Sequence, residues 1–378
     1  MSRTEDPTAL GAAATTTEIA HQPAMWRRLA QDLAEAAPRI RDFLDPLLAR
    51  TDLRIVLTGA GTSAFAGQVL APGLARTRQR RVDALATTDI VSNPGESFAH
   101  DVPTLMVSFA RSGDSPESLA AVRLANDLLT RVHHLIITCS PDGALARECP
   151  PGSLVLVMPE GTNDRSFAMT SSFTTMLLAA RLVLFPAPAT PVPERLAEAA
   201  EQVLAVMSGP DGLAATLARR GHDRVVFLGS GALTGLARES ALKLTELTAG
   251  RVPTWADSAL GFRHGPKAVL TPQTLVVVYL SNDPYTRRYD QDIAAELLSQ
   301  LGQDHVLVVG SDAGPGLRVS LDGLDDVDDV ALAGPMVIVA QSMALRFSLA
   351  LGIGPDNPFP GGQVNRVVQG VTVHALPA

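Results

Sequence analysis

The chain has 378 residues, of which 46% are hydrophobic, and this length is enough for two or three domains with a large core. The formal net charge is −8 and no basic run stands out, so we expect no nucleic-acid partner. Aromatic residues make up only 4% of the chain, which argues against a stacking surface for bases or polysaccharides.

Several features of the sequence predict a cytoplasmic protein. Two cysteines, Cys139 and Cys149, are too few for a disulfide framework, and no Cys/His spacing typical of a metal site is present. Residues 1–14 lack the apolar core of a secretion signal. No stretch approaches the roughly 20 apolar residues of a membrane span. We therefore expect neither a membrane partner nor a bound metal.

The first part of the chain alternates between helical and strand-like patterns. Residues Met25 to Leu48 have helical apolar spacing, and further helices are expected from Ser63 onward and from Pro116 to Leu129. Short apolar runs between them predict strands at Arg54–Gly59, Thr104–Phe109, Leu135–Cys139 and Leu154–Met158. This alternation predicts an α/β fold with a doubly wound parallel sheet.

The pattern then restarts after a proline-rich segment, Phe185 to Pro193, that predicts a linker followed by a helix over Glu194–Met207. The run Arg224–Gly231 (RVVFLGSG) resembles Arg54–Gly61 (RIVLTGAG) at an offset of 170 residues. Later strands are expected at Thr274–Leu280, His305–Val309 and Pro335–Ala340. These observations predict two copies of one α/β unit.

A glycine-rich loop, Gly59 to Ser63, joins the first strand to the first helix of the first unit. Glycines let backbone amides turn toward a ligand, and a helix N-terminus adds positive potential for an anion. The spacing to Gly67 does not fit the dinucleotide fingerprint. A tight turn without a ligand is an equally good interpretation of this loop alone.

A second polar loop follows the strand Thr104–Phe109 and carries Ser112 and Ser115 ahead of a helix. Serines often only cap helices, which is the simpler interpretation. However, two hydroxyl-rich loops would meet at the carboxyl edge of one sheet, where such folds bind ligands. The second unit has Ser281–Pro284 at this place instead, so we expect phosphate binding in the first unit.

Three charged residues, Glu239, Lys243 and Glu246, are spaced to share one face of a helix over Leu236–Leu247. An exposed, salt-bridged face is the simpler interpretation. Only two of the 31 basic residues are lysines, however, and Lys243 is one of them. Unlike arginine, lysine can take part in proton chemistry, and a lysine beside a carboxylate keeps it ionised as a base.

A loop bounded by glycine and proline, Gly261 to Lys267, carries His264 between the cations Arg263 and Lys267. Histidine titrates in the range useful for acid–base catalysis. A loop histidine without any function is the common alternative. The flanking cations make a core position for this histidine unfavourable.

Together these motifs resemble the sugar-isomerase (SIS) domains of glucosamine-6-phosphate synthase, over nearly the whole chain from about Thr17. Longer runs resemble the branch of stand-alone galactosamine-6-phosphate deaminase/isomerases, also called tagatose-6-phosphate ketose/aldose isomerases. These runs are Ala86–Pro94, Val107–Gly113 and Ser166–Phe173.

The resemblance implies two tandem flavodoxin-like SIS domains, each a doubly wound five-stranded parallel sheet. It implies a helical leader over 1–50, a phosphate-binding domain over 51–190, a second domain over 191–360 and a C-terminal tail over 361–378 that closes the active site. It further implies a homodimer that acts on a small sugar phosphate and needs no cofactor.

The resemblance also implies roles for single residues. Glu246 would move the proton between C1 and C2, Lys243 would line the catalytic site, and His264 would open the sugar ring from a neighbouring subunit. The implied substrate-binding residues are Gly61, Thr62, Ser63, Arg111, Ser112, Gly113, Ser115, Glu239 and Gln369.

Two departures from the synthase affect the expected reaction. About 50 residues without a cysteine precede the first strand, so glutamine-derived ammonia is not expected. The resemblance implies that Gln369 stands where the synthase has a lysine that handles the ketose carbonyl, and no lysine follows Lys267. The synthase reaction on fructose 6-phosphate is therefore not expected.

We predict a deaminase/isomerase that converts a 2-amino-sugar 6-phosphate, D-galactosamine 6-phosphate above all, to tagatose 6-phosphate and ammonia. Simple aldose/ketose isomerisation and deglycation of an amino acid–sugar phosphate are the enzymatic alternatives. A non-catalytic sugar-phosphate sensor is the alternative outside enzymes. Such sensors carry a DNA-binding helix-turn-helix ahead of a single domain, and the short leader here does not resemble one.

Overall fold

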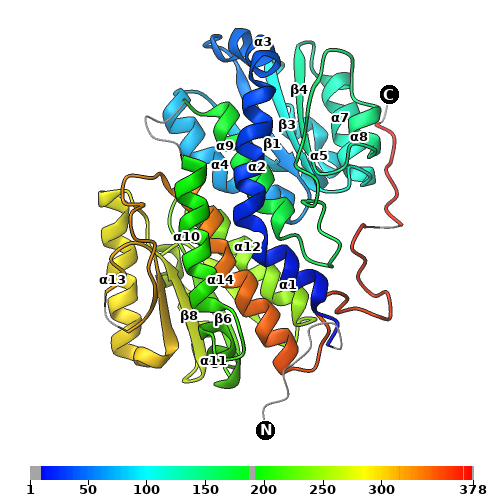
Figure 1. Cartoon of the computed structure of the whole chain (residues 1–378). Coiled ribbons are helices and arrows are strands. Elements are labelled where there is room, and N and C mark those ends of the chain that lie inside the picture. Colours follow the sequence, from blue (N-terminus) through cyan, green and yellow to red (C-terminus); the bar gives the residue numbers. More distant parts are fainter. Residues whose placement is uncertain (1–9, 187–191, 315, 369, 377–378) are drawn as a thin grey trace.

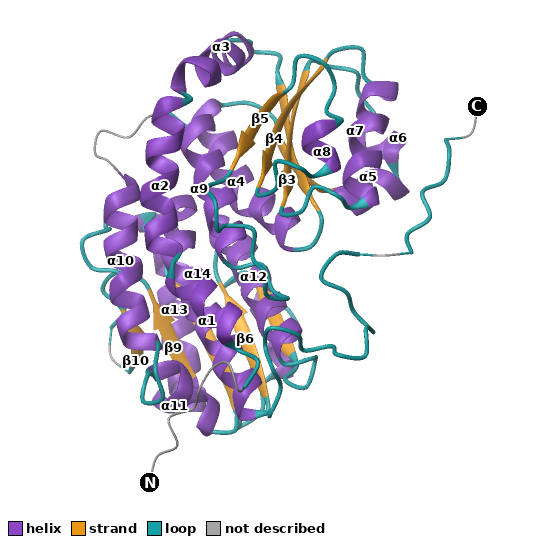
Figure 2. Ribbon diagram, turned by 45° about the vertical axis from the view of Figure 1, so that its right-hand side comes forward, coloured by secondary structure: helices purple, strands orange, loops and turns teal. Residues whose placement is uncertain are grey.

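The computed structural model describes residues 10–186, 192–314, 316–368 and 370–376. Two α/β units lie one above the other, and long helices pass between them (Figure 1). The N-terminal unit holds the first sheet, and the second sheet lies in the other unit (Figure 2).

Each unit contains a five-stranded sheet in which every paired strand is parallel. The strand orders are β2-β1-β3-β4-β5 and, read from the other edge, β7-β6-β8-β9-β10, which are the same flavodoxin-like order. The structure confirms the predicted fold class. The strands are β1 Arg54–Gly59, β2 Val82–Ala86, β3 Thr104–Ala110, β4 Val132–Thr138, β5 Leu154–Val157, β6 Arg224–Leu228, β7 Thr254–Asp257, β8 Thr274–Tyr279, β9 Val306–Val309 and β10 Leu317–Val319.

Helices cover both faces of the sheets and fill the space between the units (Figure 2). The α-helices are α1 Ala13–Ala20, α2 Gln22–Glu35, α3 Ala37–Leu48, α4 Thr62–Arg78, α5 Thr87–Ser92, α6 Pro94–Ser97, α7 Pro116–Leu128, α8 Ala144–Arg147, α9 Ser171–Leu184, α10 Val192–Met207, α11 Leu213–Arg219, α12 Ala232–Leu247, α13 Pro284–Leu301 and α14 Asp329–Ala350. Short 3₁₀ turns are η1 Gly261–Arg263, η2 Pro266–Val269 and η3 Gln303–His305.

The two units repeat the same local geometry at the predicted offset. Gly61 and Gly231 precede α4 and α12 with nearly identical backbone angles, at φ of 55° and 59°, a region that favours glycine. The helices α4 and α12 then pack directly on each other between the units. Their backbones come so close that a Cβ on Gly235 would lie 2.8 Å from the amide nitrogen of Val69.

The strand expected at Pro335–Ala340 is wrong, because this run lies inside α14. Nearly every side chain of α14 is buried, so the helix is apolar all round and has no amphipathic period to reveal it. The sequence analysis expected no stretch long and apolar enough to span a membrane, but α14 is such a helix by length and composition. In the structure, 94% of its apolar window is buried inside the protein. It is the central core helix of the described chain.

Smaller differences concern other elements. The helix predicted over Met25–Leu48 is two helices, α2 and α3, which meet at Ala36. The sequence analysis missed strands β2, β7 and β10. The predicted linker Phe185–Pro193 falls largely on residues 187–191, outside the described residues, and α10 begins at Val192 rather than Glu194.

The C-terminal segment leaves the second unit and runs back toward the first (Figures 1 and 2). Asp356 fastens its start, because its carboxylate accepts hydrogen bonds from the backbone and hydroxyl of Thr15 at 2.8 and 2.7 Å. The backbone carbonyl of Asp356 also accepts a hydrogen bond from Phe167. The segment is thereby tied to both the N-terminal helix and the loop before α9.

Candidate active site

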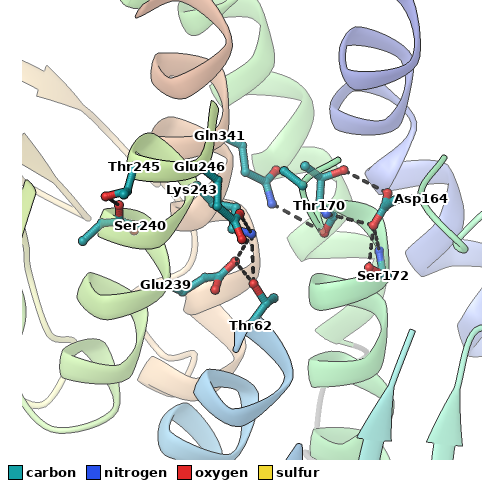
Figure 3. A network of polar contacts seen from close by, with 12 residues as sticks. Thr62, Asp164, Thr170, Ser172, Glu239, Ser240, Lys243, Thr245, Glu246 and Gln341 are labelled. Atoms are coloured by element: carbon teal, nitrogen blue, oxygen red, sulfur yellow. Dashed lines mark hydrogen bonds and ion pairs between the residues drawn. The ribbon is translucent and has the colours of Figure 1, made fainter. Parts of the chain in front are cut away.

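A buried charged cluster forms where α12 packs against the N-terminus of α4 (Figure 3). The ammonium of Lys243 lies 2.6 Å from Oε2 of Glu246, 3.5 Å from Oε1 of Glu239 and 2.9 Å from the hydroxyl of Thr62. That hydroxyl in turn donates to Oε1 of Glu239 at 3.3 Å. The side chains of Lys243 and Glu239 are 1% and 0% exposed, so the alternative of a solvated salt-bridged face is wrong.

One ammonium therefore faces two carboxylates, and this unequal number of charges affects the pKa values of Glu239 and Lys243. Burial, with a contribution from the charge of Glu246, raises the pKa of Glu239 to about 8 in spite of the neighbouring ammonium. Burial lowers the pKa of Lys243, but Glu239 and Glu246 outweigh it and the net shift is upward. Near neutral pH the cluster thus holds a charged lysine and a protonated Glu239, while Glu246 is 24% exposed at its edge.

The buried Glu239 predicts a specific pH dependence of stability. Its pKa is higher in the folded protein than its ordinary value of 4.5, so the folded state holds the proton more tightly. This contribution is complete below pH 4.5 and is lost as the pH rises through about 8. We expect Glu239→Gln to flatten the fall of the unfolding free energy between these values in denaturant titrations. Parallel curves for both proteins would contradict the buried proton.

Hydroxyl groups from two loops surround a cavity at the carboxyl edge of the first sheet. Ser63 lies at the start of α4, and Ser112 and Ser115 follow β3. Ser115 caps α7, since its Oγ accepts the amide of Ser118, and the two hydroxyls lie 2.7 Å apart. Both functions proposed for this serine, helix cap and cavity lining, are therefore present together.

The two glycines assigned to these loops have backbone roles. Gly61 takes its left-handed conformation at the turn into α4. Gly113, with φ of 75°, lies against Gly143, where a Cβ would come within 2.2 Å of the carbonyl oxygen of Ser112. The polar loop can pass this closely only because both residues are glycine.

Arg111 brings a positive charge into the same cavity, although its side chain is largely buried. Its guanidinium donates to the carbonyls of Phe167 at 3.2 Å and Arg366 at 2.7 Å, and the described residues include no carboxylate within ion-pair distance. Burial, and then the charge of Arg366, lowers the pKa of Arg111 to about 10. A buried cation paired only with carbonyls is suited to an anionic ligand.

Thr62 connects this cavity to the charged cluster. Its hydroxyl accepts from Lys243 and donates to Glu239, so the hydroxyl is engaged and not free for a ligand.

The sequence analysis missed Ser118 and Arg366, which also line the cavity. Ser118 could have been found from its spacing of three residues from Ser115, whereas the position of Arg366 depends on the path of the tail.

A rigid polar layer supports the site from the side of α9. Asp164 is buried and accepts the amides of Thr170 and Ser172 at 2.8 and 2.9 Å, and Gln341 of α14 donates to the carbonyl of Thr170 (Figure 3). This layer fixes the loop that carries Phe167, whose carbonyl accepts a hydrogen bond from Arg111.

Among the described residues, His264 makes no hydrogen bond or ion pair with this cluster. It is exposed at the turn between η1 and η2, and the described residues provide no hydrogen bond or ion pair to its ring. The flanking cations Arg263 and Lys267 both pair with Glu296 of α13. They brace the loop and leave the histidine free. Gln369 lies outside the described residues.

Comparison with known proteins agrees with this geometry. The SIS-domain family model matches residues 47–185. A relative from Streptomyces coelicolor is 57% identical over 368 residues, which is 96% of this chain and 95% of the relative. D-galactosamine-6-phosphate deaminase AgaS of Escherichia coli is 43% identical over 367 residues, 95% of each chain. The chain belongs to the SIS-domain family, in the branch of the AgaS proteins.

A solved structure of the same SIS branch supports this assignment. Tagatose-6-phosphate ketose/aldose isomerase from Escherichia coli superimposes with a TM-score of 0.88 at 40% identity, over 97% of each chain. The described part of this SIS protein has no group of three or more His, Cys, Asp or Glu side chains placed to hold a metal ion.

Proposed function

We propose that this protein converts D-galactosamine 6-phosphate to tagatose 6-phosphate and ammonia. The observation that carries the proposal is the contact between Lys243 and Glu246 beside a cavity lined by hydroxyls and by Arg111. The names of the related AgaS deaminases supply the substrate.

The cluster has the parts needed for proton transfer between neighbouring carbons. In the open-chain amino sugar, Glu246 removes the C2 proton while the C1 carbonyl oxygen takes a proton from solvent, which gives an enolamine with a hydroxyl on C1. Glu246 returns its proton to C1 and the nitrogen releases a proton to solvent, which leaves an imine at C2. Water adds to this imine, and ammonia leaves to give the ketose. Lys243 donates a hydrogen bond to Oε2 of Glu246 at 2.6 Å and so positions this carboxylate for its work as the general base.

The second unit supports an anion site in the first unit. In the second unit, the loop that corresponds to Arg111 and Ser112 donates hydrogen bonds to carboxylates. Ser281 and Asn282 lie 170 residues after Arg111 and Ser112. The amide of Ser281 donates to Asp290 at 3.0 Å, and its hydroxyl and the amide of Asn282 donate to Asp329 at 2.6 and 2.7 Å.

Protein carboxylates thus already occupy this loop in the second unit. In the described part of the first unit, no carboxylate accepts a hydrogen bond from Arg111 or Ser112. We infer that the phosphate of the substrate takes that place.

Removing both serine hydroxyls tests this phosphate site. We expect Ser112→Ala with Ser115→Ala to raise KM at least about tenfold while kcat falls less, because the hydroxyls bind a group remote from the reacting carbons. Steady-state kinetics on the 6-phosphate would measure the split. Equal activity of the wild type on galactosamine and its 6-phosphate would refute the phosphate site.

We further propose a cytoplasmic homodimer in which His264 reaches the site of the partner subunit and opens the sugar ring. The exposed ring of His264 on a braced loop supports this arrangement. Trp255 on the edge strand β7 and Leu260 beside the loop are 44% and 45% exposed, which suits a surface covered by a second copy.

A panel of hexosamine 6-phosphates, assayed for both ammonia and ketose, tests the reaction itself. Ammonia and tagatose 6-phosphate in equal amounts from D-galactosamine 6-phosphate would support the proposal. Ketose formed only from aldose phosphates would favour simple isomerisation, and no turnover on any member would favour a sensor.

A further inference from the structure

The C-terminal segment places a second guanidinium at the phosphate cavity. Arg366 lines this cavity together with Arg111, Ser63, Ser112 and Ser115. It lies in the exposed stretch of the tail that runs from the second unit to the first (Figure 2).

Arg366 is held in place only through carbonyl and amide oxygens. Its Nε donates to the carbonyl of Ser166 at 3.2 Å, and its Nη2 donates to the carbonyl of Asp164 and lies 3.4 Å from Oδ1 of Asn163. Within the described residues, its Nη1 makes no hydrogen bond and no carboxylate pairs with it. Nη1 of Arg366 is therefore available to a ligand, and no carboxylate in the described part of the chain contacts the guanidinium to compensate its positive charge.

The two arginines are also coupled to each other. Nη2 of Arg111 donates to the backbone carbonyl of Arg366, and each guanidinium repels the other. Arg111 is buried, so its repulsion by the neighbouring charge of Arg366 is unfavourable, and a bound anion would offset it. The cost is best offset by a ligand that carries two negative charges, because a single charge leaves one guanidinium unpaired.

We infer that Arg366 is a binding residue for the phosphate of the substrate and selects its dianionic form, with the C-terminal segment as its carrier. This inference rests on the proposed function, since it names a further ligand of the same phosphate. Arg111, which follows β3, and Arg366, in the C-terminal segment, together bind the dianion. Substrate binding then fastens the tail to the first unit.

Kinetics of Arg366→Gln test the role. We expect KM for the hexosamine 6-phosphate to rise at least tenfold and kcat to stay within about threefold, because the guanidinium does not touch the reacting carbons. Arg165→Gln, which removes the same charge from an exposed neighbour, is the matched control and should change KM less than twofold. An Arg366→Gln KM within twofold of wild type would overturn the inference.

A purely structural tether would also raise KM, so a second readout separates the two roles. The second pKa of a phosphate monoester is about 6, and the wild-type KM should fall as the dianion forms between pH 5 and 7. In Arg366→Gln this fall should be much smaller. An unchanged pH dependence with a uniformly raised KM would mean that Arg366 only tethers the tail.

Binding of inorganic phosphate, measured by calorimetry on the full-length protein, makes the inference independent of the reaction. We expect its affinity to drop at least tenfold in Arg366→Gln and less than twofold in Arg165→Gln. That result would stand even if no hexosamine 6-phosphate were turned over, in which case only the proposed function fails. Equal phosphate affinity in wild type and Arg366→Gln would reject the role of Arg366 and leave the proposed function intact.

Discussion

Replacing Glu246 with glutamine should lower kcat by at least about a hundredfold, because the amide has nearly the same shape but cannot accept the C2 proton. The fold should survive this change. Glu246 contributes to the raised pKa of Glu239, so without its charge Glu239 ionises more readily and takes over as the partner of Lys243.

The controls for Glu246→Gln separate lost chemistry from lost structure. Inorganic phosphate should still bind with wild-type affinity, because Glu246 is not among the residues that line the proposed phosphate cavity. Glu198→Gln, on the exposed face of α10, removes a carboxylate without touching the site and should leave kcat unchanged. Near-normal turnover by Glu246→Gln would remove this residue from the mechanism.

The part of the fold that could be predicted from sequence is its buried centre. The central strands β1, β3, β6 and β8 are almost completely buried, so each appears as a short apolar run. The three strands missed all lie at sheet edges. Strand β2 is only half-buried along its whole length. Strand β7 has no fully buried residue and contains the polar residues Thr254 and Asp257, and β10 has only three residues. An edge strand needs no continuous apolar run, and its pattern resembles a loop.

The misassigned run Pro335–Ala340 has the opposite cause. It is so thoroughly buried inside α14 that apolar residues occur on every side of the helix. A window of six apolar residues cannot distinguish a buried strand from such a helix. Length could have decided it, because the apolar character continues from Val330 to Phe347.

In the site, helical spacing placed Glu239, Lys243 and Glu246 on one face, since three- and four-residue separations fix neighbours on a helix. Spacing could not tell that α4 would cover that face and bury it. That burial turns an ordinary charged face into a cluster that holds a proton. The contribution of Arg366 depends on a contact 255 residues away in sequence, and no local pattern encodes it.

Mixing two inactive proteins, Glu246→Gln and His264→Ala, should restore activity if the site is shared between subunits. A heterodimer then holds one site with both residues intact and one with both replaced, so about half of the wild-type activity per heterodimer is expected. Two features of the loop from Gly261 to Lys267 support a contact between His264 and a partner subunit. Its cations are bound by Glu296 of the same chain, and the ring of His264 is exposed.

The mixing experiment needs proof that subunits exchange, which differently tagged chains recovered together would supply. Arg238→Gln is a suitable bystander partner for Glu246→Gln, because Arg238 bonds to Gln68 on the same α12–α4 pair but lies outside the cluster. Its heterodimer also carries one intact site and calibrates the expected half. No recovery in the Glu246→Gln and His264→Ala mixture, alongside normal recovery in this control, would place His264 and Glu246 in the same chain.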